Sequence, residues 1–331
     1  MKSTFSGTRI LVTGGSGFIG TNLMNFLLKS GCLVCNLDMA APLVPSHREC
    51  WKRLDILDAE GVAAAFRSFL PTYVVHLAAR TDIYERNSID GYAANMAGTE
   101  NVLRAVSEMP GILRVIVTSS MLVCRIGYVP ESDCDYAPPN LYGQSKVMTE
   151  TITRGFGQAI PWTIIRPTTI WGPWSLRYRD EFFRVLSKGQ YLHPGNDRII
   201  KTYGYVGNAV HQICQILQAP AEKVIGKTLY VGDPPLDLGE WVDGFSLLMR
   251  GRRARRVPLL LMRLLALSGD MLGNCGIRFP LTSFRLANMT SNNVIDLQKT
   301  IDVTGDGPYS LAKATEETIR WLNECNGDGI Q

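Results

Sequence analysis

The chain has 331 residues, of which 46% are hydrophobic and 19% charged, and its formal net charge is +4. This composition is typical of a globular protein, and so small a charge does not by itself indicate nucleic-acid binding. No stretch reaches the roughly 18 apolar residues that a membrane span needs. We expect no signal peptide, because Gly7 and Arg9 interrupt the apolar residues near the N-terminus.

Eight cysteines are scattered along the chain, and only Cys32 and Cys35 form a CxxC pair. No second pair completes a zinc site, so buried free thiols are the favoured interpretation and no metal is expected. Free thiols persist in reducing compartments, which favours a cytoplasmic location.

The first predicted strand is the apolar run Ile10–Val12, and a glycine-rich turn follows it. Behind the turn, Leu23, Phe26 and Leu27 form one apolar face of a predicted helix. A strand, a glycine turn and a helix in this order are typical of a dinucleotide site. Glycines let the backbone approach a pyrophosphate, and the N–H groups of the helix N-terminus face its charge. The turn and the first helical residues place Gly14, Gly17, Phe18, Ile19 and Gly20 in this site.

The second predicted strand, residues 33–38, ends in Asp38, 18 positions after Gly20. An acid at about this spacing accepts hydrogen bonds from the adenosine ribose, and its charge repels a 2′-phosphate, so NAD is favoured over NADP. The alternative is that Asp38 only caps the next turn. Arg48 would weaken the preference for NAD if its loop folded back.

Several later strand ends carry further candidates for the cofactor site. Residues 55–58 open a helix running to about Leu70, and an acid there serves equally as an adenine acceptor or a helix cap. In the strand over 74–79, His76 is interpreted as a core histidine rather than a catalyst. The small residues at that strand end leave room for a cofactor. The full set of cofactor candidates adds Asp55, Ile56, Leu77, Ala78, Ala79, Asn95, Thr118, Tyr142, Lys146 and Pro167.

Strand and helix patterns alternate as far as the strand over 162–167, which predicts an α/β fold with a doubly wound parallel sheet. We expect residues 1–173 to form a Rossmann NAD-binding domain. Beyond Pro173 the pattern changes, with helical segments such as 182–186 and 209–217 and a short strand at 228–231. We expect residues 174–331 to form a smaller mixed substrate-binding lobe that returns some segments to the main sheet.

Tyr142 and Lys146 are four residues apart, so on a helix they lie on one face. A phenol is a poor base at pH 7, but a nearby ammonium and a positive nicotinamide ring would lower its pKa. Such a tyrosine removes a proton from a secondary alcohol as hydride leaves the carbon, or returns one in reverse. Ser120, at a neighbouring strand end, would hold the substrate oxygen; Ser119 and Thr118 are close competitors.

The chain resembles an extended short-chain dehydrogenase/reductase of the NAD-dependent epimerase/dehydratase group. The resemblance implies a tightly held NAD, catalytic roles for Ser120, Tyr142 and Lys146, and a homodimer. It covers roughly the first 173 residues, and the C-terminal segments are also similar. The matching segments are 13–20, 38, 55–58, 76–79, 95–99, 118–120, 142–146, 166–173, 296–299 and 310–322.

Departures from the family pattern concern the substrate. Dehydratases of the family place an acid directly after the catalytic hydroxyl, where this chain has Met121 and Leu122, so dehydration lacks its acid. Epimerases of nucleotide sugars often have an aromatic-Tyr-Gly segment where residues 123–125 stand. They also often have an asparagine where Thr169 stands, and a phosphate-contacting arginine that Lys201 would replace. The candidate substrate residues are Ser120, Met121, Thr169, Lys201 and Tyr205.

Residues 250–256 contain five arginines, and residues 257–267 behind them are nearly all apolar. The favoured interpretation is a solvated edge beside a core helix. A second is that an arginine binds a substrate diphosphate, since guanidinium groups bind phosphate oxygens in pairs. Attachment to an anionic membrane surface is the least favoured of the three.

These observations predict an NAD-dependent oxidoreductase or epimerase. Its substrate would be a secondary hydroxyl or ketone of a nucleotide-activated sugar. The first alternative is an alcohol dehydrogenase of the 3-hydroxysteroid type, favoured by the apolar residues 257–267 and by Thr169. The second is a catalytically silent NAD-binding protein. The nucleotide, the sugar, the carbon attacked and the direction of reaction stay open.

Overall fold

The computed structural model describes residues 6–83, 85, 87–274 and 281–327. The chain forms two compact units. The first comprises Met1–Ile170, Gly204–Asp233 and Asp296–Tyr309. The second comprises Trp171–Tyr203, Pro234–Ile295 and Ser310–Gln331.

The first unit contains a sheet of seven parallel strands in the order β11-β6-β5-β4-β1-β2-β3. This confirms the predicted doubly wound fold, and three of the predicted strands have the bounds that the sequence indicated. One of these, residues 228–231, forms an edge of the main sheet. The strands are β1 Arg9–Thr13, β2 Leu33–Asp38, β3 Trp51–Arg53, β4 Tyr73–His76, β5 Arg114–Thr118, β6 Trp162–Pro167 and β11 Thr228–Val231.

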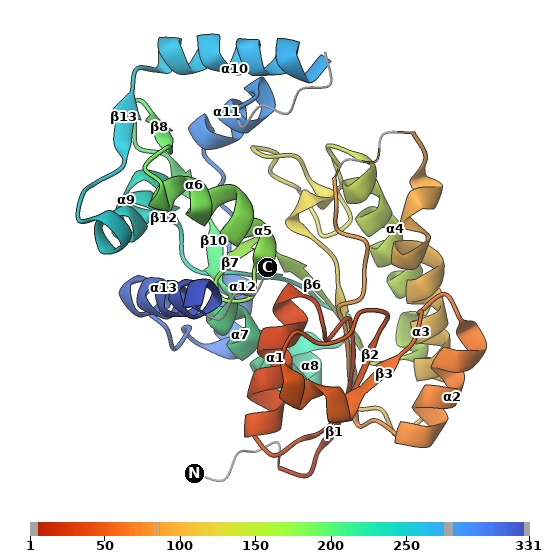
Figure 1. Ribbon diagram of the computed structural model, residues 1–331. Coiled ribbons are helices and arrows are strands. Elements are labelled where there is room, and N and C mark those ends of the chain that lie inside the picture. The colour runs from red at the N-terminus through yellow and green to blue at the C-terminus, as the bar shows by residue number, and fades with distance from the viewer. Residues whose placement is uncertain (1–5, 84, 86, 275–280, 328–331) are drawn as a thin grey trace. The chain divides into compact units, whose positions relative to one another are not determined.

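Helices cover both faces of this sheet (Figure 1). The helices α2, α3 and α4 lie on one face, over a core that includes Val62, Val102 and Val115. On the other face, α1 packs against α7, which also contacts β5 and β11. The helices of this unit are α1 Phe18–Lys29, α2 Ala59–Phe69, α3 Thr99–Ser107, α4 Leu141–Gly155, α7 Val206–Gln218, α8 Ala221–Val224 and α12 Gln298–Thr304.

The chain builds this sheet outward in two directions from β1. It runs from β1 through β2 to β3, then crosses back to place β4 on the opposite side of β1. In open parallel sheets, ligands bind outside the carboxyl ends of the strands at such a reversal. The topology therefore predicts a ligand site at the loops that follow β1, β4 and β5.

The second unit is built from short elements around an aromatic cluster. Trp241 packs against Trp171, Phe182 and Phe245, with ring centroids 5.0–5.6 Å away. Two small pairs of strands, β12 with β9 and β13 with β8, accompany the cluster. The elements are α5 Leu176–Tyr178, α6 Arg184–Ser187, β8 Leu192–Pro194, β9 Ile200–Lys201, β12 Leu236–Asp237, α9 Leu238–Arg250, β13 Arg255–Val257, α10 Leu259–Asn274, α11 Ser283–Thr290 and α13 Leu311–Gly327. The strands β7 Thr169–Trp171 and β10 Tyr203–Tyr205 lie where the chain passes between the units.

Seven cysteines lie within the described residues, and all are free thiols. Cys32, Cys124, Cys214 and Cys325 are buried, whereas Cys134 is exposed; Cys275 lies outside the described residues. Among the helices that the structure describes, none is both long and apolar enough to cross a membrane.

Candidate active site

The glycine loop between β1 and α1 closes against the end of β4. Gly14 has φ +74°, and a Cβ atom there would lie 2.6 Å from the backbone nitrogen of Ala78. A Cβ atom on Gly20 would collide with the carbonyl oxygen of Gly14. Both positions therefore require glycine for the loop to pack, because larger residues would separate α1 from the sheet.

Gly17 has a different role, since an added Cβ atom would meet one backbone oxygen at 3.3 Å. It is the N-cap of α1, and this described helix start has neither a side-chain cap nor an acidic residue in its first turn. The N–H groups of the first turn are thus available to an anion, and glycine lets that anion approach the backbone. The geometry fits the pyrophosphate of a dinucleotide.

Side chains from β2 hold the loop in place. Asn36 accepts a hydrogen bond from the backbone N–H of Gly15 at 2.9 Å, and Asp38 accepts one from that of Ser16 at 3.0 Å. The other carboxylate oxygen of Asp38 accepts from the backbone N–H of Ala40 at 2.9 Å. Asp38 therefore caps the following turn, and its role toward the ribose stays a prediction. Sequence reasoning missed Asn36, although a polar residue inside a buried strand was a visible signal.

His76 is a core histidine, as expected. Its ring nitrogens contact the hydroxyls of Thr13 at 2.7 Å and Thr99 at 3.0 Å. Burial, and to a lesser degree the charge of Lys146, lowers the pKa of His76 to about 3. The ring is therefore neutral at pH 7 and joins β1, β4 and α3.

The two acids within residues 55–58 accept hydrogen bonds from different backbone groups. Asp58 is the N-cap of α2 and accepts from the backbone N–H of Gly61 at 3.0 Å. Asp55 accepts from the backbone N–H of Leu57 at 2.9 Å. Ile56 is buried in the core beneath them. The helix cap thus belongs to Asp58, while contacts of Asp55 and Ile56 with an adenine stay predictions.

The three candidate catalytic residues converge at the carboxyl end of β5. Asn140 starts α4 by accepting a hydrogen bond from the backbone N–H of Gly143 at 2.8 Å. This start places Tyr142 and Lys146 one turn apart on the same buried side of α4. The Lys146 ammonium donates to the carbonyl oxygen of Thr118 at 2.9 Å, and Tyr142 lies close enough to Ser120 for that hydroxyl to lower its pKa.

Burial shifts the pKa values of Tyr142 and Lys146 in the directions that favour their neutral forms. Desolvation raises the pKa of Tyr142 above its ordinary value, and the hydrogen bond with Ser120 opposes that rise. Desolvation lowers the pKa of Lys146 to about 8, and the charge of Glu150 opposes the fall. In the chain by itself the phenol of Tyr142 therefore carries its proton at pH 7. The expectation that Lys146 and a positive nicotinamide ring lower this pKa concerns the chain with its cofactor bound, and it stays a prediction.

Thr118 adds an unusual polar atom to this site. Its carbonyl binds Lys146, while its hydroxyl oxygen is buried with no hydrogen-bond partner among the described residues. Buried hydroxyls normally have a partner. An unpaired one beside Lys146 and Ser120 fits a polar group of a bound cofactor. Together with the glycine loop, it shows that the residues present suit a dinucleotide.

The remaining predicted cofactor residues lie at neighbouring strand ends. Asn95 sits in a π-helical turn, Ala94–Gly98, and its side chain binds both backbone groups of Arg80 and the hydroxyl of Ser145. Such turns often occur at functional sites. The side chain of Asn95 thus forms hydrogen bonds within the protein. Leu77, Ala78 and Ala79 follow β4, and Pro167 ends β6.

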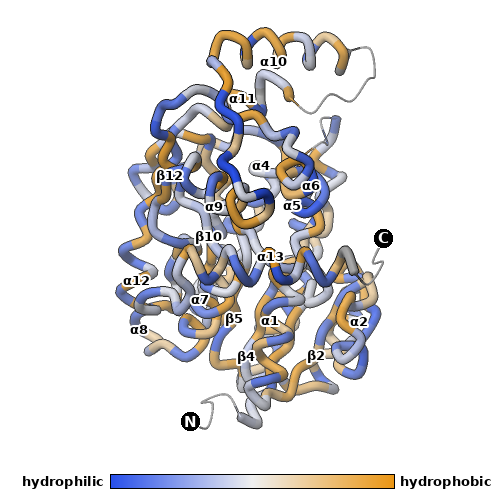
Figure 2. Tube along the Cα trace, turned by 60° about the vertical axis from the view of Figure 1, so that its left-hand side comes forward, coloured by the Kyte–Doolittle hydropathy of each residue, from blue (hydrophilic) through white to orange (hydrophobic). Residues whose placement is uncertain are grey.

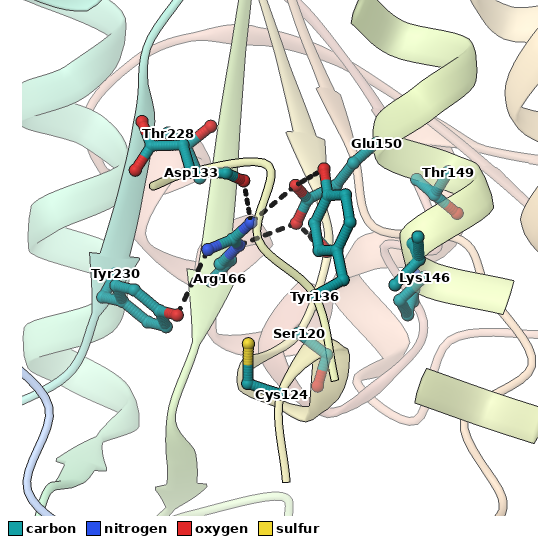
Figure 3. A network of polar contacts seen from close by, with 12 residues as sticks. Ser120, Cys124, Asp133, Tyr136, Lys146, Thr149, Glu150, Arg166, Thr228 and Tyr230 are labelled. Atoms are coloured by element: carbon teal, nitrogen blue, oxygen red, sulfur yellow. Dashed lines mark hydrogen bonds and ion pairs between the residues drawn. The ribbon is translucent and has the colours of Figure 1, made fainter. Parts of the chain in front are cut away.

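A buried polar network, which sequence reasoning missed, lies one helical turn beyond Lys146 (Figure 3). Glu150 has a fully buried side chain and binds Arg166 of β6 through two hydrogen bonds of 2.8 Å. Ser119 donates to Glu150 at 2.6 Å, and Tyr136 donates to it at 3.0 Å. The network therefore joins α4 to β6 and to the residue just before Ser120.

The candidate substrate residues fall into both units. In the first unit, the hydroxyl of Thr169 contacts the sulfur of buried Met121 at 3.8 Å, and Tyr205 packs on Tyr309. Lys201 belongs to the second unit, where burial lowers its pKa to about 8. Among the five candidates, Ser120 interacts with Tyr142, and Met121 lies in the short turn after Ser120 that packs against α4.

Residues 10–232 match the family described as the NAD dependent epimerase/dehydratase family. The chain belongs to this family. It is an NAD-dependent enzyme of the extended short-chain dehydrogenase/reductase type, which confirms the resemblance, the fold and the cofactor drawn from the sequence. The described residues that would hold NAD are the loop over 14–20 and Thr118.

Named relatives differ in their substrates. The chain is 28% identical over 326 residues to an N-acetyl-alpha-D-glucosaminyl-diphospho-ditrans,octacis-undecaprenol 4-epimerase of Escherichia coli O157:H7, covering 94% of each chain. It is 32% identical over 219 residues to a 3 beta-hydroxysteroid dehydrogenase/Delta 5-->4-isomerase of Mycobacterium tuberculosis, covering 61% of this chain and 58% of that one. The solved UDP-glucose 4-epimerase of Thermus thermophilus in complex with NAD has a TM-score of 0.69 and 20% identity, covering 96% and 99% of the chains.

Proposed function

We propose that this enzyme oxidises and re-reduces a secondary hydroxyl of a nucleotide-activated sugar, and so acts as an epimerase or a sugar dehydrogenase. The observation that carries the proposal is the convergence of Tyr142, Lys146 and Ser120 at the end of β5. All three residues belong to the first unit, which also contains the glycine loop.

Each of these residues has a defined task in the reaction. Bound NAD would supply the hydride acceptor for the carbon that bears the reacting hydroxyl. With the Lys146 ammonium and the positive nicotinamide ring of bound NAD beside it, Tyr142 would act as the phenolate, which accepts the proton of that hydroxyl and returns it when the ketone is reduced. Ser120 donates a hydrogen bond to the reacting oxygen. Lys146 is anchored on the Thr118 carbonyl, and its positive charge favours the phenolate of Tyr142 during the transfer.

Two features narrow the reaction and the substrate. Met121 and Leu122 follow Ser120, so no acid stands where family dehydratases place one, and water loss is not proposed. Relatives named as sugar 4-epimerases support a sugar substrate. A second candidate is a sugar joined through a diphosphate to a polyprenol, since the relative covered over 94% of its length is named for such a substrate. The steroid-type alcohol stays an alternative, supported by a relative matched over 61% of this chain.

Tyr142→Phe tests the proposed proton transfer. We expect turnover to fall at least about a hundredfold while NAD binding stays within about twofold, because general acid–base groups contribute 10²–10⁴-fold. Hydride exchange would be measured with nucleotide sugars, an undecaprenyl-diphospho-sugar and a 3β-hydroxysteroid. Tyr73→Phe, at the amino end of β4, is the matched control. Undiminished turnover of the Tyr142 variant would refute the assignment.

Mass spectrometry of small molecules released from the denatured protein would identify the substrate class. A nucleotide diphospho-sugar found with NAD supports the first candidate, and a polyprenyl diphospho-sugar supports the second. We also propose a cytoplasmic location, supported by the free thiols, and a homodimer, supported by the family resemblance.

A further inference from the structure

The helix α10 of the second unit is apolar on two opposite faces. Its inner face buries Met262 and Ala266 against Val257 and Leu286. Its outer face carries Leu260, Leu264, Leu267 and Met271, which are 71%, 56%, 56% and 71% exposed. The tube in Figure 2 accordingly shows α10 as hydrophobic along much of its length.

The outer residues form a continuous stripe because they are spaced by four, three and four positions. Single exposed leucines are ordinary on protein surfaces. An uninterrupted exposed stripe on one helix instead marks an interaction surface. Among the described residues, the inner face forms the hydrophobic cluster that packs α10 in this unit.

Basic residues precede this stripe in the chain, and one lies on α10 itself. Residues 250–272 contain six arginines and one aspartate. Arg252, Arg253 and Arg255 are exposed just before the helix, and Arg263 is exposed on α10 itself. The aspartate, Asp270, accepts a hydrogen bond from the backbone N–H of Ser283. The exposed apolar stripe of α10 thus follows directly on an exposed and strongly positive segment.

We propose that α10 and the arginines before it bind an anionic membrane surface, with α10 lying in the plane of the lipid headgroups. Helices that bind in this way place apolar residues among the acyl chains and basic residues at anionic headgroups. A second copy of the chain fits less well, because it would carry the same positive charge beside this face, whereas an anionic lipid surface carries the opposite charge. This reassigns the basic run from a solvated edge to a lipid contact. It does not rest on the proposed function.

Sedimentation with lipid vesicles tests the proposal. We expect the full chain to bind vesicles of phosphatidylcholine mixed with phosphatidylglycerol at low salt. It should bind pure phosphatidylcholine more weakly, and added salt should release it. No binding to the mixed vesicles at low salt would overturn the proposal.

Two variants separate the apolar from the charged contribution. Leu264→Gln with Leu267→Gln should lower the ratio of bound to free protein at least about tenfold on every vesicle. Replacing Arg252, Arg253 and Arg255 by glutamine should remove the preference for the anionic vesicles. Leu247→Gln with Leu248→Gln, on exposed positions of α9, is the matched control and should bind as the unmodified chain does.

The remaining outcomes also decide the question. Equal vesicle binding by all variants would contradict the assignment to α10. Concentration-dependent self-association that the Leu264 and Leu267 changes abolish, without vesicle binding, would show that a second copy covers the face instead. The assays measure neither NAD binding nor turnover, so their failure would leave the proposed function standing.

Discussion

Two helices of this protein bury opposite kinds of residue. The helix α4 buries Tyr142, Lys146 and Glu150 along one side. The helix α10 exposes Leu260 and Leu264 on its outer side. A pattern of polar and apolar residues read alone would place the polar side of α4 in solvent, and it would not decide which apolar side of α10 lies inside.

The two helices show what a buried polar group requires and what an exposed apolar side chain requires. Buried polar groups persist only where partners satisfy them, and the lysine and glutamate of α4 have the Thr118 carbonyl and Arg166. Exposed leucines need no partner in the folded chain, so they remain for an external surface to cover. The following predictions test how different the two helices are, beginning with the largest effect.

Glu150→Ala should lower the free energy of unfolding by about 3–5 kcal/mol. The change leaves Arg166 buried without its carboxylate, and an uncompensated buried charge is strongly destabilising. Urea denaturation measures the effect. The matched control is Glu100→Ala, which breaks the exposed pair of Glu100 with Arg104 on α3 and should cost less than about 1 kcal/mol. Similar losses in the two variants would show that the Glu150 network is not a buried charge pair in solution.

Met262→Ala and Leu264→Ala make similar truncations on opposite sides of α10. The Met262 change should destabilise the helix by about 2–5 kcal/mol, because it opens a cavity in the cluster with Val257 and Leu286. The Leu264 change should stay within about 0.5 kcal/mol, since its side chain is exposed. Hydrogen exchange of the α10 amides reports both values. Equal protection losses would mean that the outer side is also covered within the chain.

Lys146 should make stability depend on pH. Burial lowers its pKa from 10.5 to about 8, so between these values the unfolded chain holds more protons than the folded chain. The cost of burying the ammonium is therefore present below about pH 8 and is relieved as the pH rises through this window. The slope reaches at most about 1.4 kcal/mol per pH unit.

The measurement compares urea unfolding of the unmodified chain with that of Lys146→Met. As the pH rises from about 8 toward 10.5, the stability of the unmodified chain should increase relative to the variant. The variant removes the titrating amine and keeps a chain of similar length. Parallel curves would show that Lys146 is not desolvated in solution.

Local sequence patterns predicted most of the first unit. The strands over 33–38, 162–167 and 228–231 have the predicted bounds, since continuous apolar runs bounded by turns leave few alternatives for a parallel strand. The glycine spacing predicted the loop between β1 and α1. The pair of Tyr142 and Lys146 followed from a four-residue spacing, which any helix places on one face.

Three features depended on contacts between residues far apart in the sequence. Arg166 and Glu150 are 16 positions apart, and neither residue type indicates by itself that it is buried. The raised pKa of Tyr142 depends on how deeply α4 is buried, which spacing does not report. The outer side of α10 is equally apolar in sequence to its inner side, and only the packing of Met262 and Ala266 decides which side remains exposed.

The sequence by itself therefore determined the order of the elements, the glycine loop and the placement of Tyr142 and Lys146 on one side of α4, because these depend on short spacings and on residue conformations. Tertiary structure alone decided which charges are buried, which carboxylate each arginine meets and which leucines stay in water. Those properties depend on solvent exclusion, and a chain excludes solvent only when distant segments pack together.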